Sequence, residues 1–207
     1  MMHHHLPADS ALQPNLAHIE HAANHALELT DTLRIYTRQT HDHLQAVDLK
    51  THLSGIIAHF AATRPEWVTL RTNINHGSIT VFVCPAMFEH AITGILQNAI
   101  DAFAGQKGEI SIETGTDDSQ VDQRDGLFLG TMPGGNIAIL EIRDSGEGIS
   151  AEVLEHMLEP FFSTRIRASG LGLAPAAGLV FHCNAAIHVL STPGKGTCFR
   201  LLLPTHA

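Results

Sequence analysis

The sequence predicts an α+β fold, in which a long helix precedes a domain of mixed helices and strands. Three segments carry this prediction. An amphipathic helix is expected over residues 85–103, an apolar strand over 137–142, and a hairpin of two strands over 187–203. The strand at 137–142 leads into an Asp-x-Gly-x-Gly motif that begins at Asp144, and the rest of the chain is organised around this motif.

Composition limits the class of protein. The chain has 207 residues, 44% of them hydrophobic, which suits one domain with a buried core plus an appendage. A net charge of −9, with His neutral, argues against broad binding to nucleic-acid backbones. Cysteines are few and scattered (Cys84, Cys183 and Cys198), which favours a reducing compartment. No apolar run reaches membrane-spanning length and no signal-peptide pattern occurs, so we expect a cytoplasmic protein.

The N-terminal part is expected to be a loose tail over residues 1–14 and one long helix over 15–45. Apolar or small side chains recur in this helix at alternating spacings of three and four, as in a heptad pattern: Leu16, Ile19, Ala23, Ala26, Thr30 and Leu33. A single helix cannot bury such a stripe, so the pattern predicts a bundle or a partner chain. Three histidines on neighbouring turns could hold a metal ion, but a solvated polar face is the simpler interpretation (His18, His21 and His25).

A compact domain is expected from Val47 onward, after a linker that ends at residue 46. Thr51 has the side chain of an N-cap, and it predicts a helix that runs to about Ala62. The dipeptide Arg64-Pro65 ends this helix, because proline restricts the residue before it.

Three strands are expected next, over residues 68–74, 78–83 and 109–115. Asn75-His76-Gly77 lies between the first two and is typical of a hairpin turn. The third strand is followed by a polar stretch, residues 116–136, which we expect to be a surface excursion.

The helix at 85–103 carries two polar residues that need an explanation. Pro85 suits its first turn, and Asn98 and Asp101 lie within one turn of each other. Asparagine is a poor residue for a helix interior because its side chain competes for backbone hydrogen bonds. Either a buried hydrogen bond or a role as an oxygen ligand for Mg²⁺ would account for Asn98, and the spacing does not decide between them.

The Asp-x-Gly-x-Gly motif suits a ligand site. A carboxylate at the end of a buried strand, such as Asp144, needs hydrogen-bond donors, because an unpaired buried charge is costly. The exocyclic amine of adenine is one such donor. Gly146 and Gly148 let the backbone turn sharply and let a ligand approach without a Cβ in its way. Taken alone, the same motif also describes many ordinary turns.

The C-terminal third contains a candidate anion site. Ser150 can cap a short helix that Pro160 stops. Residues 161–165 follow as a loop with two exposed aromatic side chains. Residues 169–173 are rich in glycine and open a helix that ends near His182. Such a helix start gathers unpaired N–H groups at the positive end of the helix dipole, which favours an anion.

Taken together, five motifs in order resemble the ATP-binding catalytic domain of sensor histidine kinases. This domain has the Bergerat ATPase (GHKL) fold, which is shared with type II topoisomerases and heat-shock chaperones. The matching segments are residues 92–102 (asparagine box), 144–148 (first glycine box), 159–165 (phenylalanine box), 169–173 (second glycine box) and 191–199 (closing motif). The likeness runs from about Val47 to Pro204 and points to the nitrogen-regulator-like subgroup. The helix at 15–39 resembles the second helix of the family's dimerisation and phosphotransfer hairpin.

The resemblance implies a two-layer α/β sandwich with a mixed, mostly antiparallel sheet and three helices on one face. It also implies the binding site. Asp144 would accept a hydrogen bond from the adenine amine, and Asn98 would ligate Mg²⁺ bridging the phosphates. Residues 161–168 would form a mobile lid, with Arg165 or Arg167 near the γ-phosphate. The ATP contacts expected on this basis are Asn98, Asp101, Asp144, Gly146, Gly148, Phe161, Thr164, Arg165, Gly170, Leu171, Gly172, Leu173 and Thr197.

The sequence departs from the family pattern in ways that bear on function. The first helix of the hairpin, with its phospho-accepting histidine, is missing, so this chain alone is not expected to autophosphorylate. Gly94 lies four residues before Asn98, where chaperone and gyrase relatives place a water-activating Glu and kinases usually place Asn. Cys84 replaces a common Asp, and Ala168 replaces a lid glycine. The absence of Glu at position 94 argues against an ATPase.

The favoured prediction is the catalytic region of a two-component sensor histidine kinase, which binds Mg-ATP and donates the γ-phosphate to a histidine outside this chain. Its catalytic residue is not assigned. A response regulator is the expected partner, together with a second copy or a partner kinase chain through residues 15–40. The alternative is a non-catalytic, ATP-binding regulatory or adaptor module of the same fold. A third reading is an ATPase or a serine kinase that acts on a protein.

Overall fold

The computed structural model describes residues 16, 44–74, 77–116, 125–164 and 170–205. The chain divides into two compact units, Met1–Gln39 and Thr40–Ala207. In the first unit only Leu16 is described, and it is helical. The predicted tail and the rest of the heptad stripe lie outside the described residues. The predicted domain boundary after residue 46 stays a prediction, but Gln45 already belongs to a strand, so the expected helix over 15–45 does not reach its predicted end.

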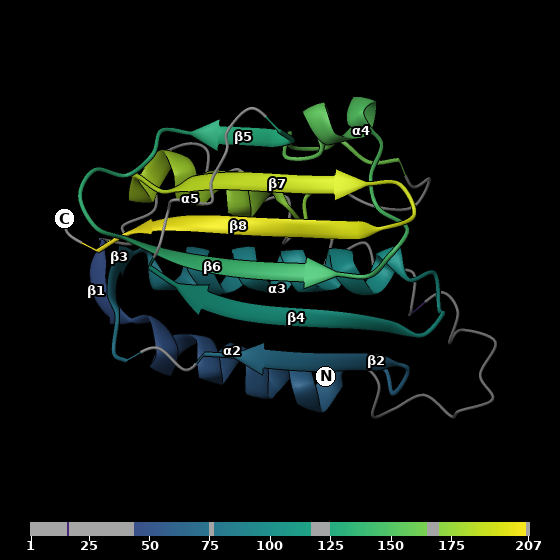
Figure 1. Ribbon diagram of the computed structural model, residues 1–207, viewed down its shortest axis with the longest axis horizontal. Helices are drawn as coiled ribbons and strands as arrows, with labels where there is room; N and C mark the ends of the chain where they lie inside the picture. Colours follow the sequence, from purple (N-terminus) through teal and green to yellow (C-terminus); the bar gives the residue numbers. More distant parts are fainter. Residues whose placement is uncertain (1–15, 17–43, 75–76, 117–124, 165–169, 206–207) are drawn as a thin grey trace. The chain divides into compact units, whose positions relative to one another are not determined.

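The second unit is built on a six-stranded sheet in the order β2-β4-β6-β8-β7-β5 (Figure 1). β2 pairs with β4 in parallel, and every other neighbouring pair in this sheet is antiparallel. The helices α2, α3 and α5 lie behind the sheet in Figure 1. The mixed, mostly antiparallel sheet and its helical layer confirm the predicted fold class. The strands are β2 (Val68–Asn73), β4 (Gly108–Gly115), β5 (Leu127–Gly130), β6 (Ile137–Asp144), β7 (Ala186–Thr192) and β8 (Gly196–Pro204).

Two of the helices match their predicted bounds closely. α3 runs over Pro85–Ala102 with its proline in the first turn, and α5 runs over Ala174–Cys183. α4 (Ala151–His156) has the predicted cap, because the Ser150 side chain accepts a hydrogen bond from the Val153 N–H. None of the helices among the described residues is long and apolar enough to span a bilayer.

The N-cap predicted at Thr51 is wrong. α2 covers Leu49–Thr63, and its N-cap is Asp48. The Asp48 carboxylate accepts a hydrogen bond from the Thr51 N–H at 2.7 Å, so Thr51 supplies the donor that a cap satisfies. Aspartate and threonine both suit the N-cap, and their order along the chain does not show which of them the helix uses.

The hairpin predicted across Asn75-His76-Gly77 is also wrong. β3 (Thr80–Val83) pairs in antiparallel fashion with β1 (Gln45–Asp48), and these two strands form a separate small sheet. β2 instead pairs in parallel with β4, which lies beyond α3 in the chain. Turn residues allow the chain to reverse, but they do not select the strand with which the next segment pairs.

The polar stretch at 116–136 is more than a surface excursion, because it contains β5. This short strand pairs with β7 at one edge of the sheet. Phe128, Met132 and Ile139 pack there against a small cluster of buried residues that comprises Ile137, Ala186 and Leu202. By strand alternation this cluster lies on the sheet face opposite Leu140 and Ile142.

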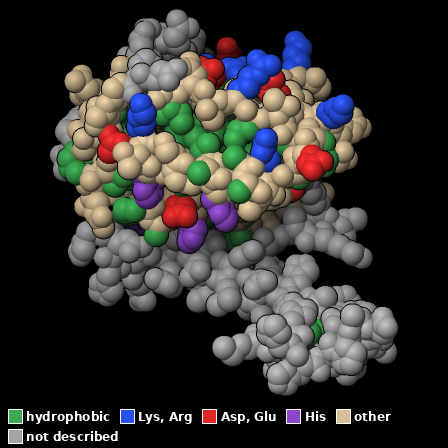
Figure 2. Space-filling model, turned by 90° about the horizontal axis from the view of Figure 1, so that it is seen from below, with side chains coloured by type: hydrophobic (Ala, Val, Ile, Leu, Met, Phe, Trp, Pro, Cys, Tyr) green, Lys and Arg blue, Asp and Glu red, His purple; other side chains and the backbone are tan. Residues whose placement is uncertain are grey.

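The main core lies between the sheet and the helices. Its largest members are almost fully buried and come from every layer: Leu49, Leu53, Phe88, Ile92, Ile95, Leu96, Ile110, Ile112, Leu140, Ile142, Leu179 and Phe199. The apolar face of α3 is used up in this core, so the opposite side of the helix, which carries Gly94, Asn98 and Asp101, stays partly open. Seen from below, the molecule shows apolar side chains gathered near its centre, with histidines along one side (Figure 2).

Candidate nucleotide site

Asp144 lies at the end of β6 and is 5% exposed. Its Oδ1 atom accepts hydrogen bonds from the Gly146 N–H at 2.8 Å and from the Thr197 N–H at 3.3 Å. No other described residue donates to this carboxylate, so Oδ2 is left for a further donor. Burial raises the pKa of Asp144, and the two backbone N–H donors only partly oppose this effect. A buried carboxylate with one unused oxygen is chemically suited to a donor such as an amine.

The loop after Asp144 is packed so closely that side chains are excluded. A Cβ at Gly146 would lie 2.7 Å from the Ala102 Cβ at the end of α3. Gly148 has φ +69, and a Cβ there would lie 2.1 Å from the Thr192 carbonyl oxygen. Gly196 has φ +88, and a Cβ there would lie 2.0 Å from the Asp144 carbonyl oxygen. The first glycine box therefore fits between α3 and the β7–β8 turn only with glycine at these positions.

Hydrogen bonds fix the same loop from both sides. The Glu147 N–H donates to the Ala102 carbonyl at 3.1 Å, and the Gly194 N–H donates to the Glu147 carbonyl at 2.7 Å. Ser191 was not among the predicted site residues. Its Oγ accepts from the Ile149 N–H at 2.8 Å and lies 2.9 Å from the Thr197 Oγ1. Ser191 belongs to the closing motif, which is the only sequence signal that could have pointed to it.

Asn98 and Asp101 lie on the open side of α3. Asn98 is partly buried, and Asp101 is exposed and accepts a hydrogen bond from the Gln97 Nε2 at 2.9 Å. Among the described residues, no group of three or more His, Cys, Asp or Glu side chains could hold a metal ion by itself. The partly buried amide oxygen of Asn98 still fits Mg²⁺, which prefers oxygen and commonly keeps waters and substrate phosphates as its other ligands.

The second glycine box precedes α5. Leu173 is the N-cap of this helix and makes no side-chain capping bond, and a proline follows in the first turn. Residues 170–173 therefore lie where a helix concentrates the positive end of its dipole. The Phe161 N–H donates to the Gly170 carbonyl at 2.9 Å, and both residues have φ +68. This backbone hydrogen bond joins Phe161, the first residue of the predicted lid, to Gly170, two residues beyond its predicted end.

The predicted lid is described only in part. Phe161 is 57% exposed, as predicted, but Phe162 is half-buried, and its ring lies 5.5 Å from that of His156. The expectation of two exposed aromatic side chains is therefore wrong for Phe162, because its ring has a partner on α4. Thr164 is exposed. Arg165, Arg167 and Ala168 lie outside the described residues.

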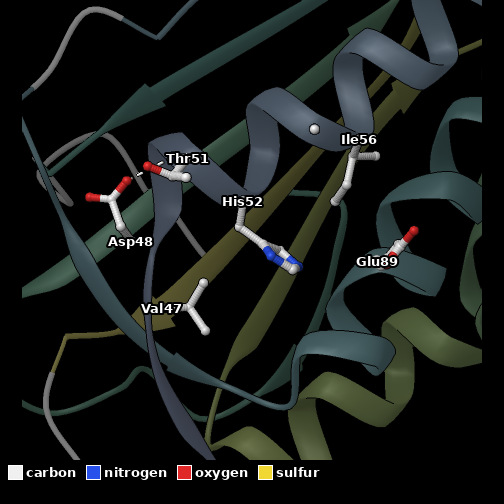
Figure 3. A pocket seen from close by; sticks show the side chains of 7 residues that line it. Val47, Asp48, Thr51, His52, Ile56 and Glu89 are labelled. Atoms are coloured by element: carbon white, nitrogen blue, oxygen red, sulfur yellow. Dashed lines mark hydrogen bonds between the residues drawn. The ribbon is translucent and has the colours of Figure 1, made fainter.

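A separate pocket of about 420 Å³ lies between β1, α2 and α3 (Figure 3). Its lining comprises Val47, Asp48, Thr51, His52, Gly55, Ile56 and Glu89. The His52 ring points between Val47 and Glu89, and its Nε2 atom is buried without a hydrogen-bond partner among the described residues. None of these residues belongs to the five motifs, so this pocket is not the candidate nucleotide site.

The family model and the related sequences point to the same family of proteins. Residues 85–207 match the family model described as histidine kinase-, DNA gyrase B-, and HSP90-like ATPase. The sensor kinase CckA of Brucella abortus is 28% identical over 92% of this chain and 20% of its own length. The sensor histidine kinase ZraS of Escherichia coli K12 is 30% identical over 82% of this chain and 33% of its own length. The chain thus spans a third or less of these relatives.

Solved structures share the fold. Full-length ShkA, solved in complex with AMPPNP, has a TM-score of 0.71 at 16% identity, over 96% of this chain and 40% of ShkA. The histidine kinase ThkA, solved in complex with the response regulator TrrA, has a TM-score of 0.64 at 16% identity, over 98% of this chain and 54% of ThkA. The family match covers more than half of the chain, so the chain belongs to the histidine kinase-, DNA gyrase B- and HSP90-like ATPase family.

Proposed function

We propose that the chain is the catalytic region of a sensor histidine kinase, which binds Mg-ATP and donates its γ-phosphate to a histidine outside this chain. The observation that carries the proposal is the Asp144 carboxylate, with Oδ1 engaged by two backbone N–H groups and Oδ2 left for a ligand. The family match and the sensor kinases among its relatives support this choice within the family.

Asp144 would select adenine. The exocyclic amine of adenine can donate a hydrogen bond to Oδ2, whereas guanine presents a carbonyl oxygen at the equivalent position. Two acceptors facing each other in a buried site leave both groups unpaired, which is strongly unfavourable. Gly146 and Gly148 would act through the fold, because their lack of a side chain lets the loop after Asp144 pack against Ala102 and Thr192.

The phosphates would lie between α3 and the start of α5. The N–H groups of residues 170–173 and the dipole of α5 favour an anion there. Asn98 is the residue of α3 that would hold Mg²⁺, and the bound ion would neutralise phosphate charge during transfer. Asp101, Phe161, Thr164, Arg165 and Thr197 complete the proposed ATP site.

The acceptor histidine would lie outside the 207 residues of this sequence. No histidine here has the sequence context of a phosphoacceptor, and the chain spans a third or less of the relatives CckA and ZraS. Residues 15–40 would supply a dimerisation helix, and a response regulator would receive the phosphoryl group. The solved complex of ThkA with TrrA supports that kind of partner.

Calorimetric titration with a non-hydrolysable ATP analogue tests the site directly. We expect micromolar binding that needs Mg²⁺, with no binding of the GTP analogue. Asn98→Ala should abolish this Mg²⁺-dependent binding, because it removes the proposed oxygen ligand. Full binding without Mg²⁺, or equal affinity for both bases, would contradict the proposal.

The alternative is an ATP-binding regulatory module that transfers no phosphate, and Gly94 favours it, because glycine stands where kinases usually place Asn. A purified acceptor hairpin with its histidine separates the two. The kinase predicts labelling of the hairpin from γ-labelled ATP, and no labelling of a matched hairpin with His→Gln. Nucleotide binding without transfer to the hairpin of a related kinase would support the regulatory module.

A further inference from the structure

Gly94 brings α3 into direct contact with the second glycine box. A Cβ at Gly94 would lie 1.9 Å from the carbonyl oxygen of Gly172 and 3.0 Å from its carbonyl carbon. Such a contact would require a shift of about 1 Å or more to reach ordinary packing distance. The neighbouring atoms are backbone, so no side chain can rotate away to make room. The approach of residue 172 to α3 therefore exists only because residue 94 is glycine.

The loop cannot easily retreat from this contact. The Phe161 N–H donates to the Gly170 carbonyl at 2.9 Å, and a Cβ at Gly170 would lie 2.4 Å from the Phe161 carbonyl carbon. The Ala174 N–H donates to the Leu171 carbonyl at 3.1 Å, and Leu171 is 3% exposed. The loop is thus held by Phe161, by the start of α5 and by α3.

We propose that Gly94 is a positioning residue for phosphate binding. Because Gly94 has no side chain, the second glycine box can contact α3 one helical turn before Asn98. The contact between Gly94 and Gly172 fixes the distance between the loop N–H groups and the Asn98 amide. Both of these groups must act on the same phosphates. The inference rests on the proposed ATP site and adds to it a residue that makes no contact with ATP itself.

In the family pattern, position 94 carries an Asn or Glu side chain, and glycine supplies neither. In this chain, the backbone of Gly172 fills the space beside Gly94, so an added side chain has no room. Restoring Asn at position 94 should therefore weaken phosphate binding instead of improving it.

The first test examines the contact between Gly94 and Gly172 in the absence of nucleotide. It uses Gly94→Ala and the matched control Gly55→Ala. Both glycines lie inside helices, but a Cβ at Gly55 meets nothing within 4 Å. Alanine at an open helical site is stabilising, so Gly55→Ala should raise the unfolding midpoint by about 2–4 °C. Gly94→Ala should lower the midpoint and speed amide hydrogen exchange at residues 170–174. A raised midpoint with unchanged exchange would overturn the proposal.

The second test separates positioning from general damage. Gly94→Ala and Gly94→Asn should bind the ATP analogue at least tenfold more weakly, while their affinity for adenosine stays within twofold, because Asp144 is untouched. Gly55→Ala should match the wild type for both ligands. Equal loss for adenosine and ATP, wild-type affinity for ATP, or a Gly94→Ala chain that does not fold would each contradict the proposal. If the wild type binds no nucleotide, the proposed function fails. The first test still decides whether Gly94 positions the second glycine box on α3.

Discussion

At the scale of single residues, Asp144 combines a cost in stability with its proposed role in binding adenine. Burial raises its pKa, so the fold disfavours the ionised form relative to the unfolded chain. This cost is fully present above the raised pKa. It is relieved as the pH falls through that pKa towards the ordinary range of an aspartate, because the folded state then takes up the proton more readily. Adenine binding should weaken as the pH falls through this pKa, since it uses the ionised carboxylate of Asp144.

Asp144→Asn should therefore stabilise the protein while abolishing adenine binding. The amide oxygen can still accept from the Gly146 and Thr197 N–H groups, but the variant has no charge to bury. We expect a higher unfolding midpoint at pH 7, a difference that disappears in acid, and at least a tenfold loss of ATP affinity. Thermal melts across pH and calorimetry measure both.

Glu155→Gln removes a charge from the exposed surface and is the matched control for Asp144→Asn. It should change neither the midpoint nor the affinity. A lower midpoint for Asp144→Asn at pH 7 would show that the carboxylate stabilises the fold, contrary to its raised pKa.

At the scale of elements, α2 depends on its acidic cap. The side chain of Ser78, followed by the side chain and N–H of Thr51, lowers the pKa of Asp48 to about 2. A lowered pKa stabilises the folded state fully above the ordinary range of aspartate, and this stabilisation is lost as the pH falls towards 2. Asp48 also lies at the end of β1, so it links the small sheet to α2.

Asp48→Ala should lower the unfolding midpoint at pH 7, because the Thr51 N–H loses its acceptor. The difference from the wild type should shrink steadily as the pH falls from 4 towards 2, down to the part that an uncharged carbonyl oxygen still contributes. Asp48→Asn should retain part of the stability, since its amide oxygen can still accept. Thermal melts across this pH range measure the effect, with Glu66→Gln as an exposed control. A difference that does not vary with pH would contradict the assignment.

Elements whose signals are local could be predicted from the sequence. α3, α5 and the β7–β8 hairpin each carry their apolar pattern and their end signals within one continuous segment. The partners of β2 and β3 could not be predicted, because they lie far away in the chain and the turn between them suggests a hairpin. β5 was missed because four residues in a polar stretch carry too little pattern, and its stability comes from β7 and the cluster around Ile137.

The candidate site shows the same division. The resemblance predicts that Asp144, Gly146 and the second glycine box belong to one site, and this grouping stays a prediction. The contact between Gly94 and Gly172 and the hydrogen bonds of Ser191 join residues that are far apart along the chain. No local pattern marks such contacts, so only the structure could bring them to notice.

At the scale of the whole molecule, the division into two units predicts an autonomous fragment. Residues 40–207 should fold alone, unfold in one transition and bind the ATP analogue as the full chain does. Residues 49–207 lack β1 and the Asp48 cap, leaving β3 without its pairing partner. That shorter fragment should melt at a lower temperature, as circular dichroism can measure. Equal melting of the two fragments would show that β1 adds nothing to the fold.

The position of β8 has a consequence for the order of folding during synthesis. β8 lies between β6 and β7 in the sheet, yet it is the last of the strands to leave the ribosome. Until it emerges, β6 has only β4 beside it, and the β5–β7 pair has no link to the rest of the sheet. The sheet of the nascent domain must therefore stay incomplete until β8 emerges. The hydrogen bond from the Thr197 N–H of β8 to the Asp144 carboxylate can form only at that step.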